Sequence, residues 1–197
     1  MLTAATIAVL VNGDVRAINV ALGLRDVDRA LQLAQAFEDQ RARFHAPYII
    51  HVNDATVDQI EVITEFRRYV VTAEEQLRQG NWLFAQDARA AQAALRSWRG
   101  RLSLIARLRF HPQNTLSTVP LYDVTIGRPD VAPLDVVRTP VTALLSGMPG
   151  DFNAPIMGAT IEGIFDAASV GQTARPVIVS LAGQDVARVT VDFAKLE

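Results

Sequence analysis

The stretch TVDQIEVITEFRRYVVTAEEQLRQGNWLFAQDARAAQAALRSW, residues 56–98, decides the predicted fold. Apolar side chains recur along it at steps of three and four residues, the spacing that places them on one face of a helix. They are Val57, Ile60, Ile63, Phe66, Val70, Ala73 and Leu77, followed by Phe84, Ala88, Ala91, Leu95 and Trp98. Gly80 can take the left-handed conformation that ends a helix, and Asn81 can cap the next one. The stretch therefore predicts a long antiparallel helical hairpin.

The hydrophobic period changes after Gly100. Apolar and charged residues alternate for most of residues 102–110, which predicts a strand with one buried face. Five further strand-like runs follow, separated by turn residues, at 121–126, 134–137, 159–165, 176–181 and 186–193. Several short strands without intervening helices are typical of an antiparallel sandwich or barrel.

The last two of these runs form the clearest hairpin. The segments 177–181 and 186–191 alternate in polarity across the turn Ala182-Gly183-Gln184-Asp185. This hairpin resembles those of immunoglobulin-like modules in architecture only, because the cysteine pair and core tryptophan of true immunoglobulin domains are absent from it. The resemblance implies an immunoglobulin-like β-sandwich in the C-terminal half.

Three segments precede the hairpin. Residues 6–22 fit either a β-hairpin with an Asn12-Gly13 turn or two short helices, and both interpretations stay open. Asp26 is the expected N-cap of a helix to about Phe44. Residues 48–52 then suit a short strand or an extended linker. The expected fold class is thus α+β, with a mainly helical region at 1–99 and a β-sandwich domain at 100–197.

Composition excludes several classes of protein. The net charge of −2 gives no reason to expect nucleic acid binding, which needs a positive surplus. The absence of cysteine excludes disulfides, thiolate metal sites and cysteine nucleophiles. No segment reaches the roughly 20 apolar residues of a membrane-spanning helix, so we expect membrane contact only after rearrangement. Cytoplasmic residence is the default expectation, with export without a cleaved signal left open, and the bias toward arginine and alanine indicates a bacterial gene.

For every candidate chemical motif, a structural role explains the residues better than a functional role. His45, His51 and Asp54 form only a weak candidate metal set, and Asp123 with Asp135 is a weak acid–base pair. Neither a serine nucleophile elbow nor a phosphate-binding glycine loop is present in the sequence. Asp151 and Asn153 suit turn chemistry better than calcium binding. We therefore predict no enzyme, no cofactor and no metal.

A run of arginines remains as a candidate interaction surface. Arginines recur from residue 89 to residue 109 and can meet an acidic partner or anionic lipid, although ion pairs within the chain and the covering of apolar surface by arginine stems are the stronger interpretation. The residues predicted for this surface are Trp82, Arg89, Arg96, Arg99 and Arg101.

The sequence favours a non-enzymatic protein–protein interaction or assembly module of a bacterial protein complex. In this hypothesis the sandwich is a platform and the helical hairpin is an oligomerisation arm, so the partner is another protein or a second copy. The alternatives are a membrane-active, pore-forming or toxin-like protein, and an enzyme of unrecognised class.

Overall fold

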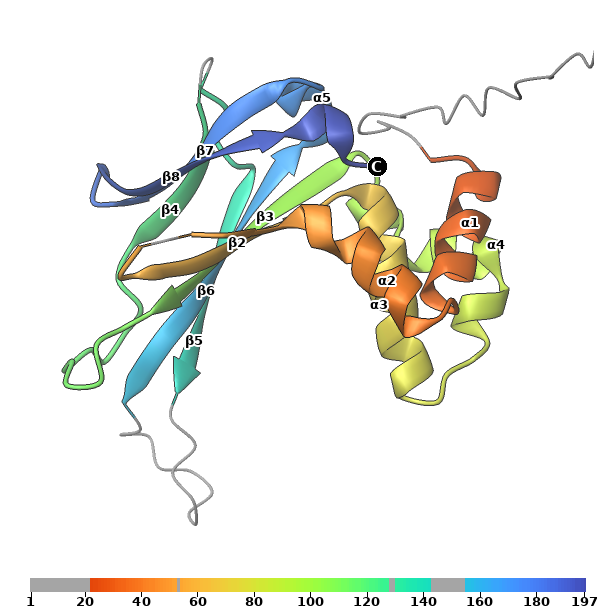
Figure 1. Cartoon of the computed structure of the whole chain (residues 1–197), viewed down its shortest axis with the longest axis horizontal. Helices are drawn as coiled ribbons and strands as arrows, with labels where there is room; N and C mark the ends of the chain where they lie inside the picture. The colour runs from red at the N-terminus through yellow and green to blue at the C-terminus, as the bar shows by residue number, and fades with distance from the viewer. Residues whose placement is uncertain (1–21, 53, 128–129, 143–154) are drawn as a thin grey trace, which may run out of the picture.

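Two antiparallel sheets and a group of helices make up the part of the protein that the structure describes (Figure 1). The structure is a computed structural model and describes residues 22–52, 54–127, 130–142 and 155–197. The predictions for residues 1–21 and for Asp151 and Asn153 lie outside the described residues. Within them the fold is α+β, as the sequence predicts.

The first half of the described chain holds most of the helices. Its elements are α1 (Leu24–Ala34), α2 (Glu38–His45), η1 (Ala46–Tyr48), β1 (Ile49–His51), β2 (Val57–Ile63), α3 (Glu65–Arg78), η2 (Phe84–Gln86), α4 (Ala88–Ala94) and η3 (Arg96–Trp98). The second half holds β3 (Arg101–Arg109), β4 (Tyr122–Ile126), β5 (Asp135–Thr142), β6 (Ile156–Asp166), α5 (Ala167–Val170), β7 (Ala174–Leu181), β8 (Gln184–Asp192) and η4 (Phe193–Lys195). Each η element is a single turn of 3-10 helix.

The strands form one five-stranded sheet and one three-stranded sheet. The order is β1-β2-β3-β6-β5 in the first and β4-β7-β8 in the second, and every pairing is antiparallel. Apolar residues from both sheets pack into one core, with Phe165, Ile161, Leu104 and Val179 fully buried. The strand predicted after Gly100 and the hairpin of β7 and β8 are therefore confirmed, whereas the immunoglobulin-like likeness stays a prediction.

The predicted helical hairpin over 56–98 is wrong, because the seven residues Val57–Ile63, which include the first three of its apolar pattern, form strand β2. A β-bulge between Val57 and Gln59 breaks the alternation of the strand. As a result Val57 and Ile60 are both buried although they are three residues apart, a spacing that imitates a helix. The helix begins only at Glu65, where the side chain of Thr64 accepts a hydrogen bond from Arg67 N.

The remainder of the predicted hairpin is shorter than expected. Gly80 has a φ of 82° and follows the C-terminus of α3, as its lack of a Cβ allows. Asn81 caps no helix; α4 begins instead after Asp87, whose carboxylate accepts from Arg89 N and Ala90 N. The second helix is therefore only seven residues long.

The helix predicted from Asp26 to Phe44 is two helices. Gly23 precedes the first turn of α1, and Asp26 reaches back to accept a hydrogen bond from Gly23 N at 3.0 Å. The chain leaves α1 after Ala34, where the Gln35 side chain donates to the carbonyls of Leu31 and Ala85. The second of these bonds ties the end of α1 to the turn η2.

Helices α1 to α4 and the turns between them are called the helical unit below. Apolar residues of α1, α3, η2 and α4 pack into a second core, in which Leu31, Phe66 and Val70 are buried. Phe44 contacts both cores. The predicted division at residues 99 and 100 stays a prediction, but the five-stranded sheet takes β1 and β2 from before it and β3, β5 and β6 from after it.

Candidate functional site

A pocket of about 310 Å³ opens on the helical unit beside the start of β3. It is lined by Tyr69, Arg89, Gln92, Ala93, Arg96 and Arg99. We call these six residues the arginine pocket. Helix α3 supplies the tyrosine, and α4 supplies Arg89, Gln92 and Ala93. The turn η3 and the residue after it supply the last two arginines.

Local structure explains why three arginines reach one pocket. Positions 89, 92, 93 and 96 are three or four residues apart, so they share one side of α4 and of the turn that continues it. The opposite side of α4 carries Ala91, which is fully buried in the helical core. Arg99 follows η3 directly, before Gly100 turns the chain into β3 with a φ of 67°.

Positive charge exceeds negative charge around this pocket. None of Arg89, Arg96 and Arg99 forms a salt bridge within 4 Å with any described residue. Glu65 is the carboxylate whose charge attracts Arg99, and its Oε2 accepts a hydrogen bond from Gly100 N at 2.8 Å. Burial raises the pKa of Glu65, while the Gly100 bond and Arg99 oppose that rise.

Tyr69 lies in this pocket with a buried ring and only 2% exposure. Burial raises the pKa of its phenol, the charge of Glu65 adds to the rise, and Arg99 opposes it. The phenol is therefore a protonated donor at neutral pH. Its hydroxyl forms no hydrogen bond with the part of the chain that the structure describes.

The structure brings together three of the five residues predicted for the interaction surface. Arg89, Arg96 and Arg99 line one pocket, as described above. Trp82 lies instead in the turn between α3 and η2, and Arg101 is an exposed residue at the beginning of β3. Sequence reasoning missed Tyr69 and Gln92; the arginine spacing predicts Gln92 on the same helix side, but nothing in the sequence marks Tyr69.

A second polar cluster lies where the helical unit meets the five-stranded sheet. Buried Arg67 donates from Nη1 to the Val62 carbonyl at 2.6 Å, from Nη2 to Glu61 Oε1 at 2.6 Å and from Nε to His45 Nδ1 at 3.2 Å. His45 Nε2 lies 3.1 Å from both carboxylate oxygens of Glu74. We call Arg67, Glu61, His45 and Glu74 the junction network.

The junction network fixes the tautomer of its histidine. His45 Nδ1 accepts a hydrogen bond from Arg67 Nε–H, so this nitrogen carries no proton of its own. The proton of the ring is therefore on Nε2, which donates a hydrogen bond to Glu74. Burial lowers the pKa of Arg67, and the Glu61 carboxylate opposes that fall. Each charged group here already has a partner, so the network joins α2, α3 and β2.

The weak metal and acid–base candidates are not brought together. His45 belongs to the junction network, His51 ends β1, and Asp54 accepts hydrogen bonds from Thr56 N and Val57 N. Those backbone bonds lower the pKa of Asp54. Asp123 lies in β4, where it pairs with Arg138 at 2.5 Å, whereas Asp135 begins β5 of the other sheet. Among the described residues, no cluster of three or more His, Cys, Asp or Glu residues could hold a metal ion.

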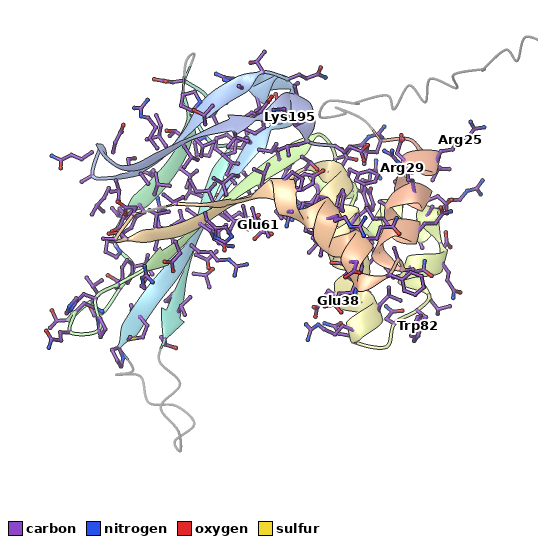
Figure 2. The ribbon with its side chains drawn as sticks, viewed as in Figure 1. Arg25, Arg29, Glu38, Glu61, Trp82 and Lys195 are labelled. Carbon is purple, nitrogen blue, oxygen red and sulfur yellow. The ribbon has the colours of Figure 1, made fainter. Side chains whose placement is uncertain are left out.

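The far end of the helical unit exposes large apolar side chains. Phe37, in the turn between α1 and α2, is 89% exposed, and Trp82 and Leu83, in the turn after α3, are 59% and 78% exposed. The hydrogen bond from Gln35 to Ala85 O joins the end of α1 to η2, which directly follows Leu83. Figure 2 shows Trp82 at the same end as Glu38, the residue after Phe37. We call Phe37, Trp82 and Leu83 the apolar end.

A wider depression of about 400 Å³ lies on the three-stranded sheet. Its lining includes Thr125, Ser180 and the side chains of Asp185 and Arg188, which pair with each other at 2.5 Å. That pairing satisfies both charges, so the depression offers less surplus charge than the arginine pocket.

The chain matches no protein-family model, no curated protein and no solved structure. No helix within the described residues has both the length and the apolar character needed to cross a membrane.

Proposed function

We propose that this protein is a non-enzymatic interaction module that docks on a partner protein through the apolar end of its helical unit. The observation that supports the proposal is the exposure of Phe37, Trp82 and Leu83 on two turns. A hydrogen bond joins the elements beside these turns, the end of α1 and η2. Aromatic residues are enriched among the residues that dominate binding energy at protein interfaces. The two sheets, immunoglobulin-like in this proposal, are then the platform that carries the helical unit.

The size of the apolar end indicates the kind of partner. Three exposed side chains on two turns make a small apolar surface, which suits insertion into an apolar groove better than a broad flat interface. Glu38 and Arg78 are exposed neighbours of these turns and give the surface a polar rim. The partner is therefore expected to present a concave apolar site.

Site-specific photo-crosslinking in the source cell tests this proposal. A photoreactive residue at position 83 is expected to give one discrete crosslinked species that disappears when Trp82→Ser and Phe37→Ser are added. The matched control is position 121, because Leu121 is equally apolar and 72% exposed but lies beside β4. The proposal is wrong if position 83 gives no more product than position 121.

Self-association is a separate outcome of the same experiment. A crosslinked species of twice the mass of the chain identifies a second copy as the occupant and contradicts docking on a different protein. Size-exclusion chromatography with light scattering then checks it, since Leu83→Ser should lower the apparent mass and Leu121→Ser should not.

The alternative of a membrane-active protein shares the apolar end, because exposed aromatic residues also suit the interface of a bilayer. Dye release from anionic liposomes separates the two hypotheses. Leakage that requires Trp82 and Leu83 supports the membrane-active alternative, and intact liposomes at high protein concentration contradict it.

A further inference from the structure

The arginine pocket gathers three guanidinium groups, none of which forms a salt bridge with a described residue. Several other exposed arginines pair with carboxylates, as Arg109 does with Asp58 at 3.0 Å. Others, such as Arg43, are also exposed and without a salt bridge among the described residues, but they do not share a pocket with further arginines. Like charges held close together repel each other, so a bound anion would relieve this repulsion.

We propose that the arginine pocket binds a phosphate group that carries two negative charges. This site is independent of the proposed docking through the apolar end, which lies on other turns of the helical unit. Three guanidinium groups and no carboxylate line the pocket, and Glu65 and Asp87 are the neighbouring carboxylates, so positive charge is in surplus there. A phosphate monoester or inorganic phosphate, which carries up to two negative charges at neutral to alkaline pH, suits that surplus.

The donor geometry favours phosphate over a single carboxylate. One guanidinium suffices to hold a carboxylate in a bidentate pair, whereas three guanidinium groups around one cavity can reach the several oxygens of a tetrahedral anion. Buried Tyr69 also lines the pocket, and its hydroxyl can add a neutral donor. A volume of about 310 Å³ holds a phosphate group together with part of the molecule that carries it.

The surrounding contacts keep the pocket in shape without a ligand. The Asp87 carboxylate fixes the first turn of α4, and Gln92 donates to the Leu22 carbonyl at 3.4 Å. The bond between Gly100 N and Glu65 fixes the chain immediately after Arg99. The backbone that carries the arginines is therefore positioned in advance, which lowers the entropic cost of binding.

Titration with inorganic phosphate at constant ionic strength, followed by NMR of the arginine Nε–H groups, tests the proposal. We expect saturable shifts at Arg89, Arg96 and Arg99, with chloride giving none. Each of Arg89→Gln, Arg96→Gln and Arg99→Gln should weaken binding about tenfold, because a charge-assisted hydrogen bond is lost. Tyr69→Phe should weaken binding by a smaller factor.

The matched control is Arg43→Gln. Arg43 is also exposed and without a salt bridge among the described residues, but it lies on α2 and does not line the pocket. An equal loss of binding in Arg43→Gln would show a general charge effect and overturn the proposal, as would the absence of saturable shifts in the intact chain. An unchanged thermal midpoint in the glutamine variants shows that any loss is not due to unfolding.

A second arm identifies the source of the phosphate group. Vesicles containing phosphatidic acid present the same phosphate monoester on a surface. Sedimentation with these vesicles that is lost in Arg96→Gln assigns the pocket to a lipid headgroup. Binding of inorganic phosphate without vesicle binding assigns it to a soluble phosphate compound, and binding of neither contradicts the proposal.

Discussion

Nη2 of Arg67 lies 2.6 Å from Oε1 of Glu61, and Nη2 of Arg107 lies 3.3 Å from Oε2 of the same carboxylate. The two arginines differ in burial: the side chain of Arg67 is 3% exposed and that of Arg107 is 58% exposed. One carboxylate therefore offers a buried and a surface ion pair for direct comparison.

Arg67→Met should lower the free energy of unfolding by about 3 kcal/mol, because it leaves Glu61 and the Val62 carbonyl without their buried donor. Arg107→Met should cost less than about 1 kcal/mol, since solvent screens the exposed pair. Urea denaturation of both variants measures the difference. Equal losses in the two variants would contradict the larger contribution of the buried pair.

The buried carboxyl of Glu65 gives a prediction on pH. Burial raises its folded-state pKa above the usual value of 4.5, so its contribution to stability is present below that pH and is lost as the pH rises through the folded-state pKa. Glu65→Gln removes the titration and keeps an acceptor for Gly100 N. The variant should therefore gain stability relative to the natural chain between about pH 4.5 and neutral pH.

Glu75→Gln is the control for this pH profile, since it should change stability in the opposite direction. The hydrogen bond from Arg78 lowers the pKa of exposed Glu75, so ionised Glu75 contributes stability above its usual pKa and loses it as the pH falls. Thermal midpoints measured from acid to neutral pH report both profiles. A profile for Glu65→Gln parallel to that of the natural chain would contradict the assignment.

Gly158 packs directly on the backbone of β3. A Cβ at this position would lie 2.2 Å from the Leu108 carbonyl oxygen, a distance that only a shift of paired strands can relieve. Gly158→Ala should therefore destabilise the protein by about 2 kcal/mol or more. Gly163→Ala in the same strand should cost less, because its Cβ would meet the Phe165 ring at 3.0 Å and a side chain moves more easily than a backbone. Denaturant midpoints compare the two, and a smaller loss for Gly158→Ala would contradict the close packing.

Periodicity predicted the strands better than the helices. The alternation after Gly100 is regular, and β3 begins at Arg101 as expected. In β2 the bulge between Val57 and Gln59 places two buried residues three positions apart. A helix has the same spacing of buried residues, so the apolar pattern alone does not distinguish this strand from a helix. Thr64 is the residue in the sequence that marks the boundary between strand and helix, because its side chain caps α3.

The sequence likewise predicts one part of the candidate site and not the other. The charge run indicated Arg89, Arg96 and Arg99, because residues close in sequence on one helix side stay close in space. Tyr69 comes from α3, and the junction network joins residues as far apart as His45 and Glu74, 29 positions along the chain. Such contacts depend on how the helices pack on the sheet, which a single sequence does not encode locally.

The cap of α3 supplies the last prediction. Thr64 Oγ1 accepts a hydrogen bond from Arg67 N at 3.2 Å and donates another to the Glu197 carbonyl. Thr64→Ala removes both and should cost about 1–2 kcal/mol, as the loss of a helix N-cap does. Thr64→Ser retains the hydroxyl and should cost markedly less. Hydrogen exchange at the first amides of α3 measures the local effect: protection of Arg67 N should fall in the alanine variant and persist in the serine variant. If both variants exchange alike, the hydroxyl does not cap the helix in solution, and α3 begins for a different reason.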